Sequence, residues 1–182
     1  VAPLRLATDG RSTPAPCPVP LARRGVSLSF LHAVAADPKV GVHTTTAEVC
    51  QALVKPTTAG AACAYYDLLW SHDANRGGGN EKGNERYAGE SDFFLSHTWS
   101  YRFRDLVAVI EAFEHRLAPR TTQYYWFDIF VMNQHCKHDL HSEQLVENLR
   151  AAVRAPGRVL LALDSWHKPS PLARVWCLLE IY

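Results

Sequence analysis

The chain has 182 residues, of which 47% are hydrophobic and 20% charged, and its formal net charge is +1 at pH 7. This length and composition suffice for one globular core. The near-neutral charge, without a basic stripe in the sequence, argues against a nucleic-acid binder. Because no apolar run approaches the roughly 20 residues of a membrane span, we also expect no such span.

The cysteines give no sign of a disulfide framework. They are odd in number and widely scattered, and no two form a C-x-x-C pair, which also argues against a Cys-rich zinc site. A reducing compartment suits this pattern, so we expect an intracellular, cytoplasmic protein. The cysteines are Cys17, Cys50, Cys63, Cys136 and Cys177.

The first part of the chain has the composition of an extended leader. Residues 1–25 contain five prolines, and residues 1–36 contain four arginines against a single acid, Asp9. We predict that residues 1–40 are a poorly ordered, Pro-rich leader. An organelle transit peptide has the same charge bias, so that alternative stays open.

A short helical region is predicted over residues 41–75. A threonine among residues 44–46 is expected to cap a helix over 47–54 that Pro56 ends, and a second helix is expected over 61–70.

Residues 76–90 are predicted to be a Gly-rich linker. They are polar and lack the G-x-x-x-x-G-K-[ST] pattern of a phosphate-binding loop. We therefore expect no nucleotide phosphate to bind there.

From residue 91 to residue 182 the pattern is that of an α/β domain. Three continuous apolar runs predict strands that are covered on both faces, which is typical of a parallel sheet. Amphipathic helical stripes separate the runs, and Gly157 is expected to close one of these helices in a left-handed conformation. The predicted strands are residues 93–96, 124–131 and 159–163, and the stripes are 106–117, 142–153 and one that begins at residue 172.

We expect a flavodoxin-like sheet in which these three strands have the order 2-1-3, with helices on both faces. Three strands are few for such a sheet. We therefore expect the domain to be incomplete at its C-terminus, with the third strand as an exposed edge.

Ligands of such sheets bind beyond the carboxyl ends of the strands, where the strand order reverses. Here that place falls between the first and third strands, where His97, Trp99, Ser165, Trp166 and His167 are expected. These rings can hold a planar group between them. Alternatively, the tryptophans cover the core and the histidines lie in solvated loops.

Asp128 is the least expected charge, because it interrupts the second apolar run. A buried carboxylate is costly unless it is paired. Arg102, Arg104 or a backbone amide are the expected partners, and a structural network is favoured over catalysis.

A loop rich in potential metal ligands follows this run. The candidate ligands are His135, Cys136, His138, Asp139 and His141. They lie within seven consecutive residues, whereas a structural zinc site normally combines two separated ligand pairs. We expect no metal site.

Several segments, taken in order, resemble a TIR domain. The resemblance extends from Asp92 to Tyr182 and is closest to a TIR-like group of algal and other protist proteins. Its specific element is R-V-W-C-L-L-E-I, which is similar to the x-W-C-L-x-E-[LI] segment of plant TIR domains. The matching segments are D-F-F-L-S-H at 92–97, W-F-D at 126–128, the loop 133–141 in the place of the BB loop, the strand 159–165, and 174–181.

The resemblance implies cleavage of NAD+ at the nicotinamide–ribose bond, with NAD+ as substrate and no further cofactor. The catalytic carboxylate carried over by position is Glu180, which from the sequence alone reads as a solvent-facing residue beside Trp176. Trp99 would cover the nicotinamide or adenine, Ser96 would lie in the pocket floor, and Arg102 or Arg104 would meet the pyrophosphate. The binding residues expected in all are Ser96, His97, Trp99, Arg102, Arg104, Ser165 and Trp166.

The chain departs from the family at His97-Thr98-Trp99, where S-[FY]-R is more usual, and this puts the contacts of that loop in doubt. The alternative function is a non-catalytic TIR scaffold that self-associates through the BB loop and exposed helices. NAD+ cleavage is the favoured reading. An unrelated flavodoxin-type nucleotide-binding domain is weaker, because no Gly-rich phosphate loop follows the first strand.

Overall fold

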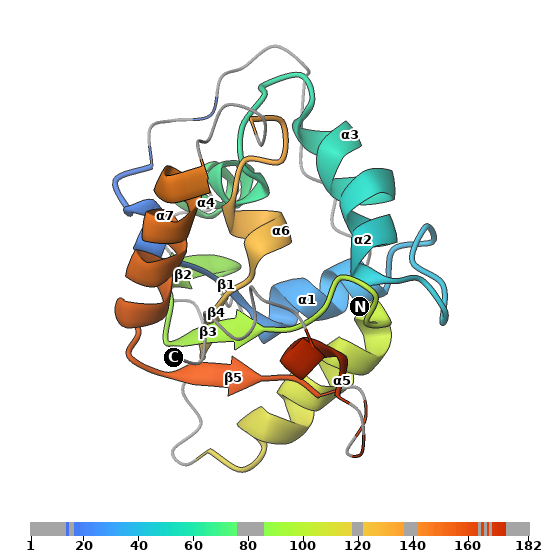
Figure 1. Cartoon of the computed structure of the whole chain (residues 1–182). Helices are drawn as coiled ribbons and strands as arrows, with labels where there is room; N and C mark the ends of the chain where they lie inside the picture. Colours follow the sequence, from blue (N-terminus) through green and yellow to red (C-terminus); the bar gives the residue numbers. More distant parts are fainter. Residues whose placement is uncertain are drawn as a thin grey trace.

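The fold is an α/β architecture built on one five-stranded sheet in the order β2-β1-β4-β3-β5 (Figure 1). The computed structural model describes residues 14, 17–75, 86–117, 122–136, 142–163, 165, 167 and 169–173. The strands are β1 (Arg24–Ser27), β2 (Ala88–Glu90), β3 (Phe93–Ser96), β4 (Tyr124–Trp126) and β5 (Val159–Leu161).

One half of the sheet is parallel. Strand β3 lies between β4 and β5, and it pairs in parallel with both, with Phe93 opposite Tyr125 and Phe94 opposite Val159. All four residues of β3 are buried, as expected for a strand covered on both faces. The predicted parallel pairing and the predicted order 2-1-3 are confirmed.

The other half of the sheet is antiparallel and was not predicted. Strand β1 pairs with β4 and with β2, and these two strands lie in the predicted leader and linker, respectively. The prediction of a poorly ordered leader is therefore wrong for residues 17–40, and β1 and β2 join the sheet across the predicted boundary at residue 91. Both strands are short, and their pairing partners are distant in sequence, so local composition does not reveal them.

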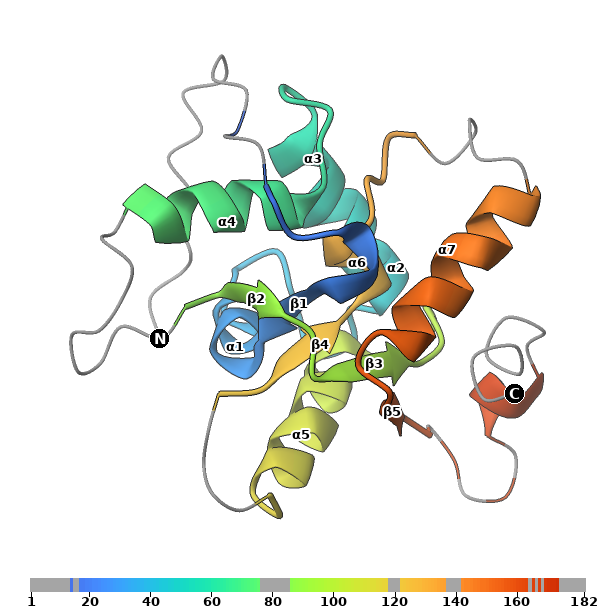
Figure 2. The ribbon, with the colours of Figure 1, turned by 90° about the vertical axis from the view of Figure 1, so that its left-hand side faces the viewer.

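The helices cover both faces of the sheet. Figure 2 shows α5 on one side and α4 and α7 on the other. Helix α5 connects β3 to β4, and α7 connects β4 to β5. Because these two helices lie on opposite sides of the sheet, the two parallel crossovers lie on opposite faces. The longer helices are α1 (Leu28–Ala35), α4 (Tyr65–Asn75), α5 (Phe103–Glu114) and α7 (Ser142–Arg154).

The second strand ends earlier than predicted. The strand stops at Trp126, and Asp128–Val131 form the short helix α6. The Asp128 carboxylate accepts a hydrogen bond at 2.7 Å from the Ile129 amide, one of the first amides of the helix, which lack intrahelical acceptors. An apolar run by itself does not distinguish a buried helical turn from a buried strand, and this corrects the prediction of a strand through Val131.

The predicted cap at residues 44–46 is confirmed. Thr45 and Glu48 form a reciprocal capping box at the start of α2 (Thr46–Val49). The hydrogen bonds from the Thr45 backbone amide and hydroxyl lower the pKa of the Glu48 carboxyl.

Pro56 does not end this helix, contrary to prediction. A π-helical turn, η2 (Cys50–Val54), continues α2 into α3 (Lys55–Thr58), and Pro56 lies in the first turn of α3. The amide of Lys55 donates to the Cys50 carbonyl, five residues earlier. Proline, which has no N–H, is tolerated at this position.

One aromatic core joins the first and second halves of the chain. The Phe30 ring on α1 packs edge-on against the Phe130 ring on α6, with centroids 4.9 Å apart, and Phe30 also contacts Tyr65 on α4. Phe130 in turn contacts Phe103 and Phe127. The segment before residue 91 and the parallel strands therefore stabilise one another.

Two features complete the described fold. Gly157 has a φ of 65°, which confirms the left-handed conformation predicted after α7. Within the described residues, β5 ends the sheet, and no helix has the length and apolar character needed to cross a membrane.

Candidate functional site

The candidate site lies at the edge where the three parallel strands end. Because β3, β4 and β5 run in the same direction, the residues that follow Ser96, Trp126 and Leu161 meet at one edge of the sheet. Ser96 is fully buried and pairs with Leu161. The crossover from β3 to β4 and the crossover from β4 to β5 lie on opposite faces of the sheet (Figure 1). The strand order therefore reverses between β3 and β5, beside Ser96.

A short hydrogen bond joins the loops that follow β3 and β4. Nε1 of Trp99 donates to Oδ2 of Asp128 at 2.6 Å, and Oδ1 of Asp128 accepts from the Ile129 amide. The indole is partly buried against the core. The predicted backbone-amide partner of Asp128 is thus confirmed, whereas neither Arg102 nor Arg104 is its partner.

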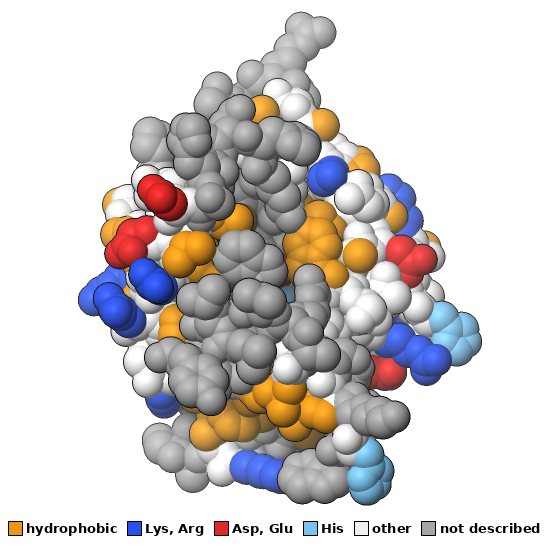
Figure 3. Space-filling model, viewed as in Figure 1, with side chains coloured by type: hydrophobic (Ala, Val, Ile, Leu, Met, Phe, Trp, Pro, Cys, Tyr) orange, Lys and Arg blue, Asp and Glu red, His pale blue; other side chains and the backbone are white. Residues whose placement is uncertain are grey.

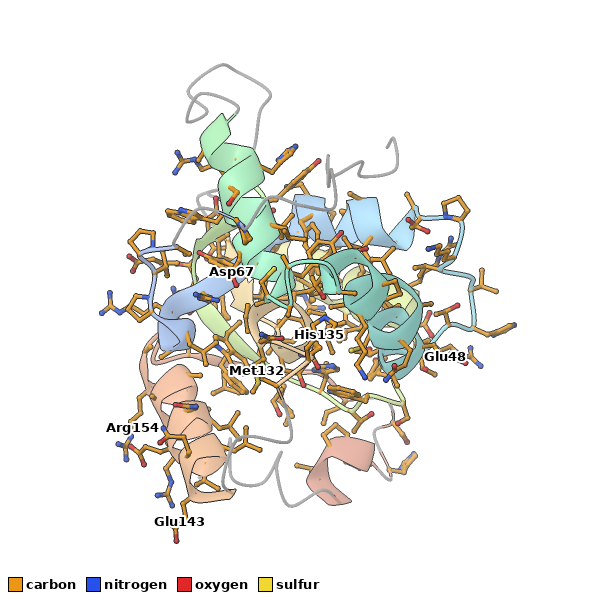
Figure 4. The ribbon with its side chains drawn as sticks, turned by 90° about the horizontal axis from the view of Figure 1, so that it is seen from above. Glu48, Asp67, Met132, His135, Glu143 and Arg154 are labelled. Carbon is orange, nitrogen blue, oxygen red and sulfur yellow. The ribbon has the colours of Figure 1, made fainter. Side chains whose placement is uncertain are left out.

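Gln134 links this pair to the N-terminal helices. Its side-chain amide nitrogen donates to the carbonyl oxygens of Asp128 and Met132 at 3.0 and 3.1 Å, and its side-chain oxygen accepts from the Cys50 thiol at 3.6 Å. Figure 4 shows Met132 and His135 between α7 and the helices that precede residue 76. The turn that carries Asp128 is therefore held from both its side-chain and main-chain groups.

The loop after β3 is docked on the start of α2. The amide of Ala47 donates to the Trp99 carbonyl, and the amide of Thr46 donates to the Tyr101 carbonyl, each at 2.9 Å. The first amides of a helix lack intrahelical acceptors, so this contact satisfies both partners. The Tyr101 hydroxyl also donates to the carbonyl of Leu163, beyond β5, at 3.2 Å. This bond links the loop after β3 to the segment after β5.

His97 does not lie at the rim of this edge, contrary to prediction. Its side chain is 7% exposed, and its ring packs edge-on against the Phe127 ring with centroids 4.7 Å apart. His167 and Ser165 are exposed. The expectation that both imidazoles line one open crevice therefore fails for His97, whereas the Trp99 indole is partly exposed.

The two arginines proposed for a pyrophosphate differ in their availability. Nε of Arg104 donates to the Ala35 carbonyl at 3.1 Å, which places the guanidinium on the carboxyl end of α1. Arg102 precedes α5 directly after the Trp99 loop. Its side chain is exposed, and its Nη1 forms a long ion pair with Oδ2 of Asp105 at 4.0 Å. Arg102 is therefore the better candidate of the two.

The loop after α6 is fastened to α3 by His135. The Thr58 hydroxyl donates to the Val54 carbonyl at 2.8 Å, so it accepts from Nε2 of His135, also at 2.8 Å. That tautomer makes the imidazole a donor toward Thr58 and excludes it as a base for this hydroxyl. Within the described residues, no three His, Cys, Asp or Glu side chains gather as metal ligands; His138, Asp139 and His141 lie outside them.

Some predicted site residues lie outside the described part of the chain. These are Trp166 and the segment 174–182, which includes Trp176 and Glu180. Conversely, the sequence interpretation missed Gln134, Tyr101 and Cys50 as parts of the network. Gln134 stands in the loop 133–141 that the resemblance had marked, whereas no local pattern marks Tyr101 or Cys50.

The surface charge is mixed in sign. On the face seen in Figure 3, Lys and Arg side chains lie near Asp and Glu side chains at both margins, with hydrophobic side chains between them. Such a distribution does not produce a single basic field.

No protein-family model, no curated protein and no solved structure matches the chain. The residues and their geometry therefore carry the functional proposal.

Proposed function

We propose that the chain carries a TIR-like domain that cleaves the nicotinamide–ribose bond of NAD+ in a signalling protein. The observation that carries this proposal is the placement of Trp99. Its partly exposed indole lies at the carboxyl edge of three parallel strands, beside the reversal of strand order, and the Asp128 carboxylate holds it there. This is where α/β sheets of this order bind nucleotides.

The reaction requires little acid–base catalysis by the protein. Nicotinamide leaves as a neutral molecule, while the ribose acquires oxocarbenium character, so one carboxylate beside the ribose can stabilise the developing charge. The resemblance assigns that role to Glu180. The general acid of an ordinary glycosidase is not needed, because the departing pyridine nitrogen takes the bonding electron pair without a proton.

The described residues support distinct parts of NAD+ binding. The Trp99 indole offers a flat apolar face for the nicotinamide or the adenine. Ser96, fully buried at the end of β3, keeps the assignment to the pocket floor that the resemblance gives it, and Ser165 is exposed beyond β5. Arg102 is the cation we assign to the pyrophosphate, because the Arg104 guanidinium is engaged with α1. Trp166 keeps its assignment from the sequence.

The test is release of nicotinamide from NAD+, followed by chromatography, with the purified protein before and after induced clustering. We expect release by the unaltered protein and none by Glu180→Gln, which keeps the size of the side chain and removes its charge. Glu143→Gln is the matched control, because Glu143 is an exposed carboxylate at the start of α7 (Figure 4). Absence of nicotinamide release from every sample would reject the proposal.

The second candidate is a non-catalytic scaffold that assembles through TIR-like surfaces. Two exposed hydrophobic side chains favour it. Val159 lies in β5, at the edge of the described sheet, and is 39% exposed; Leu172 lies in the segment that follows β5 and is 45% exposed. A protein that releases no nicotinamide but grows in molecular mass with concentration, as measured by light scattering, would support this candidate.

A further inference from the structure

We propose that Asp128 is a positioning residue, whose carboxylate holds the Trp99 indole as a rigid platform for a planar ring of the nucleotide. The proposal deepens the proposed function and rests on its assignment of NAD+ to this edge. Asp128 touches no reacting atom in this scheme and acts through Trp99.

The Asp128 carboxylate is itself held in one orientation. Each of its oxygens accepts one hydrogen bond, from the Trp99 indole at 2.6 Å and from the Ile129 amide at 2.7 Å. The main-chain carbonyl of Asp128 accepts from Gln134, which is 4% exposed. Rotation of the carboxylate would break one of these bonds, so its direction toward the indole is determined by the start of α6.

The indole is held from its backbone as well. The Trp99 carbonyl accepts from the Ala47 amide at 2.9 Å, and the Asp128 contact restrains the far end of the same side chain. A ring restrained at both ends loses little freedom when a second ring stacks on it, and this reduces the entropic cost of binding. Base–aromatic stacking accepts any planar heterocycle and therefore suits nicotinamide or adenine.

A carboxylate is an expensive group at this place if its role is structural only. Among the ion pairs of the described residues, none includes Asp128, so no cation offsets its partial burial there. The start of α6 does not require it either, because Asp128 is the first residue of the helix and its N-cap, Phe127, makes no side-chain cap hydrogen bond. What the carboxylate adds is a charge-assisted acceptor that meets the indole N–H at a short distance.

The test uses the whole chain and four variants: Asp128→Ala, Asp128→Asn, Trp99→Phe and the double variant Trp99→Phe/Asp128→Ala. The affinity for NAD+ is measured by calorimetry, and KM and kcat are measured from nicotinamide release. We expect Asp128→Ala to raise both Kd and KM by about tenfold, the size of one lost charge-assisted hydrogen bond, with little change in kcat. Asp128→Asn keeps an uncharged acceptor for the indole and should return part of the affinity.

The Trp99→Phe background separates positioning from general stability. Phenylalanine keeps a flat ring and lacks the N–H, so Asp128→Ala should have no further effect on Kd in that background. An equal loss in both backgrounds, or an Asn variant as weak as the Ala variant, would overturn the proposal. If Asp128→Ala does not fold, as judged by its thermal unfolding, the same comparison is made with Asp128→Asn, which should then weaken binding less than Trp99→Phe does.

The two proposals can fail separately. If the protein binds NAD+ but releases no nicotinamide, the proposed catalysis is wrong, and the binding series still decides the role of Asp128. If the protein releases nicotinamide and the Asp128 variants leave Kd and KM unchanged, the positioning role is wrong and catalysis stands. If it binds no NAD+ at all, both are rejected.

Discussion

Trp126 donates from its indole nitrogen to the carbonyl oxygen of Leu21 at 3.0 Å, across 105 positions of the sequence. Trp126 ends β4 and is 2% exposed, so its N–H depends on a partner within the protein. That partner comes from the segment directly before β1. The Pro-rich beginning of the chain thus satisfies a buried donor in the centre of the sheet.

A fragment of residues 86–182 is therefore expected not to fold alone. Without β1, strand β4 becomes an open edge and the Trp126 N–H loses its acceptor, while the core loses Val26 and Phe30, both fully buried. Circular dichroism should show no cooperative thermal transition for this fragment.

Complementation provides the control for this prediction. Residues 17–75 contribute β1 and α1 to α4, and adding this piece to residues 86–182 should restore a cooperative transition. A cooperative transition of the isolated 86–182 fragment would instead reinstate the domain boundary at residue 91.

The parallel half of the fold could be predicted because its signals are local. Continuous apolar runs such as Phe93–Ser96, separated by amphipathic stripes, specify strands covered on both faces and the helices that connect them. Strands β1 and β2 have no such signal. Ala88-Gly89-Glu90 is a poor strand by propensity and is held by its pairing with Arg24–Val26, a relationship that no local window contains.

The candidate site was predictable in its location and not in its contacts. Strand polarity alone places the residues after β3 and β5 together, so Trp99 and Ser165 could be named from the sequence. The partner of Asp128 could not, because it depends on how two loops meet across the sheet. The same holds for His97, whose ring turns into the core against Phe127.

Gly25 is expected to tolerate no side chain. A Cβ at this position of β1 would lie 2.8 Å from Cβ of Tyr124 and 2.9 Å from Cα of Ser91, and neither atom is the end of a flexible side chain. Gly25→Ala should therefore lower the free energy of unfolding by about 1–3 kcal/mol, as overpacking of a core does. Urea denaturation measures this change.

Gly41 provides the matched control for Gly25. A Cβ at Gly41 would meet Oγ1 of Thr44 at 3.5 Å, an ordinary contact. Gly41→Ala should alter the free energy of unfolding by no more than about 0.5 kcal/mol. Equal effects of the two substitutions would contradict the packing of β1 against Tyr124.

Alkaline unfolding is expected to involve three buried tyrosines. Burial raises the pKa of Tyr65, Tyr66 and Tyr125, and the hydrogen bond from Tyr125 to Glu114 raises the pKa of Tyr125 further. In the unfolded chain these hydroxyls ionise near pH ~10, so above that pH the unfolded state holds fewer protons than the folded state and is favoured. Stability should therefore be fully present below pH ~10 and should fall as the pH rises.

Ultraviolet absorbance of tyrosinate, recorded together with circular dichroism, checks this prediction. The signals of the three buried tyrosines should rise in one step with the loss of structure. Tyr125→Phe removes one ionising group and should make the decline of stability with pH shallower, by about 1.4 kcal/mol per pH unit. Full tyrosinate formation in a protein that keeps its secondary structure would contradict the described burial.

The described cysteines are expected to react with an alkylating agent in a defined order. Cys136 is exposed, whereas burial, with a smaller contribution from Asp67, raises the pKa of the Cys63 thiol to about 11. Since the thiolate is the reactive form, at about pH 8 Cys63 should react much more slowly than Cys136, and its rate should rise roughly tenfold per pH unit until the pH approaches that pKa. Cys50 is buried, with its thiol donating to Gln134, and should react only as the protein unfolds.

Peptide mass spectrometry after timed alkylation gives the order, and Cys136→Ser should remove the fast phase while leaving the Cys63 rate unchanged. A Cys63 rate equal to that of Cys136 and independent of pH would contradict the packing of Cys63 beside α4.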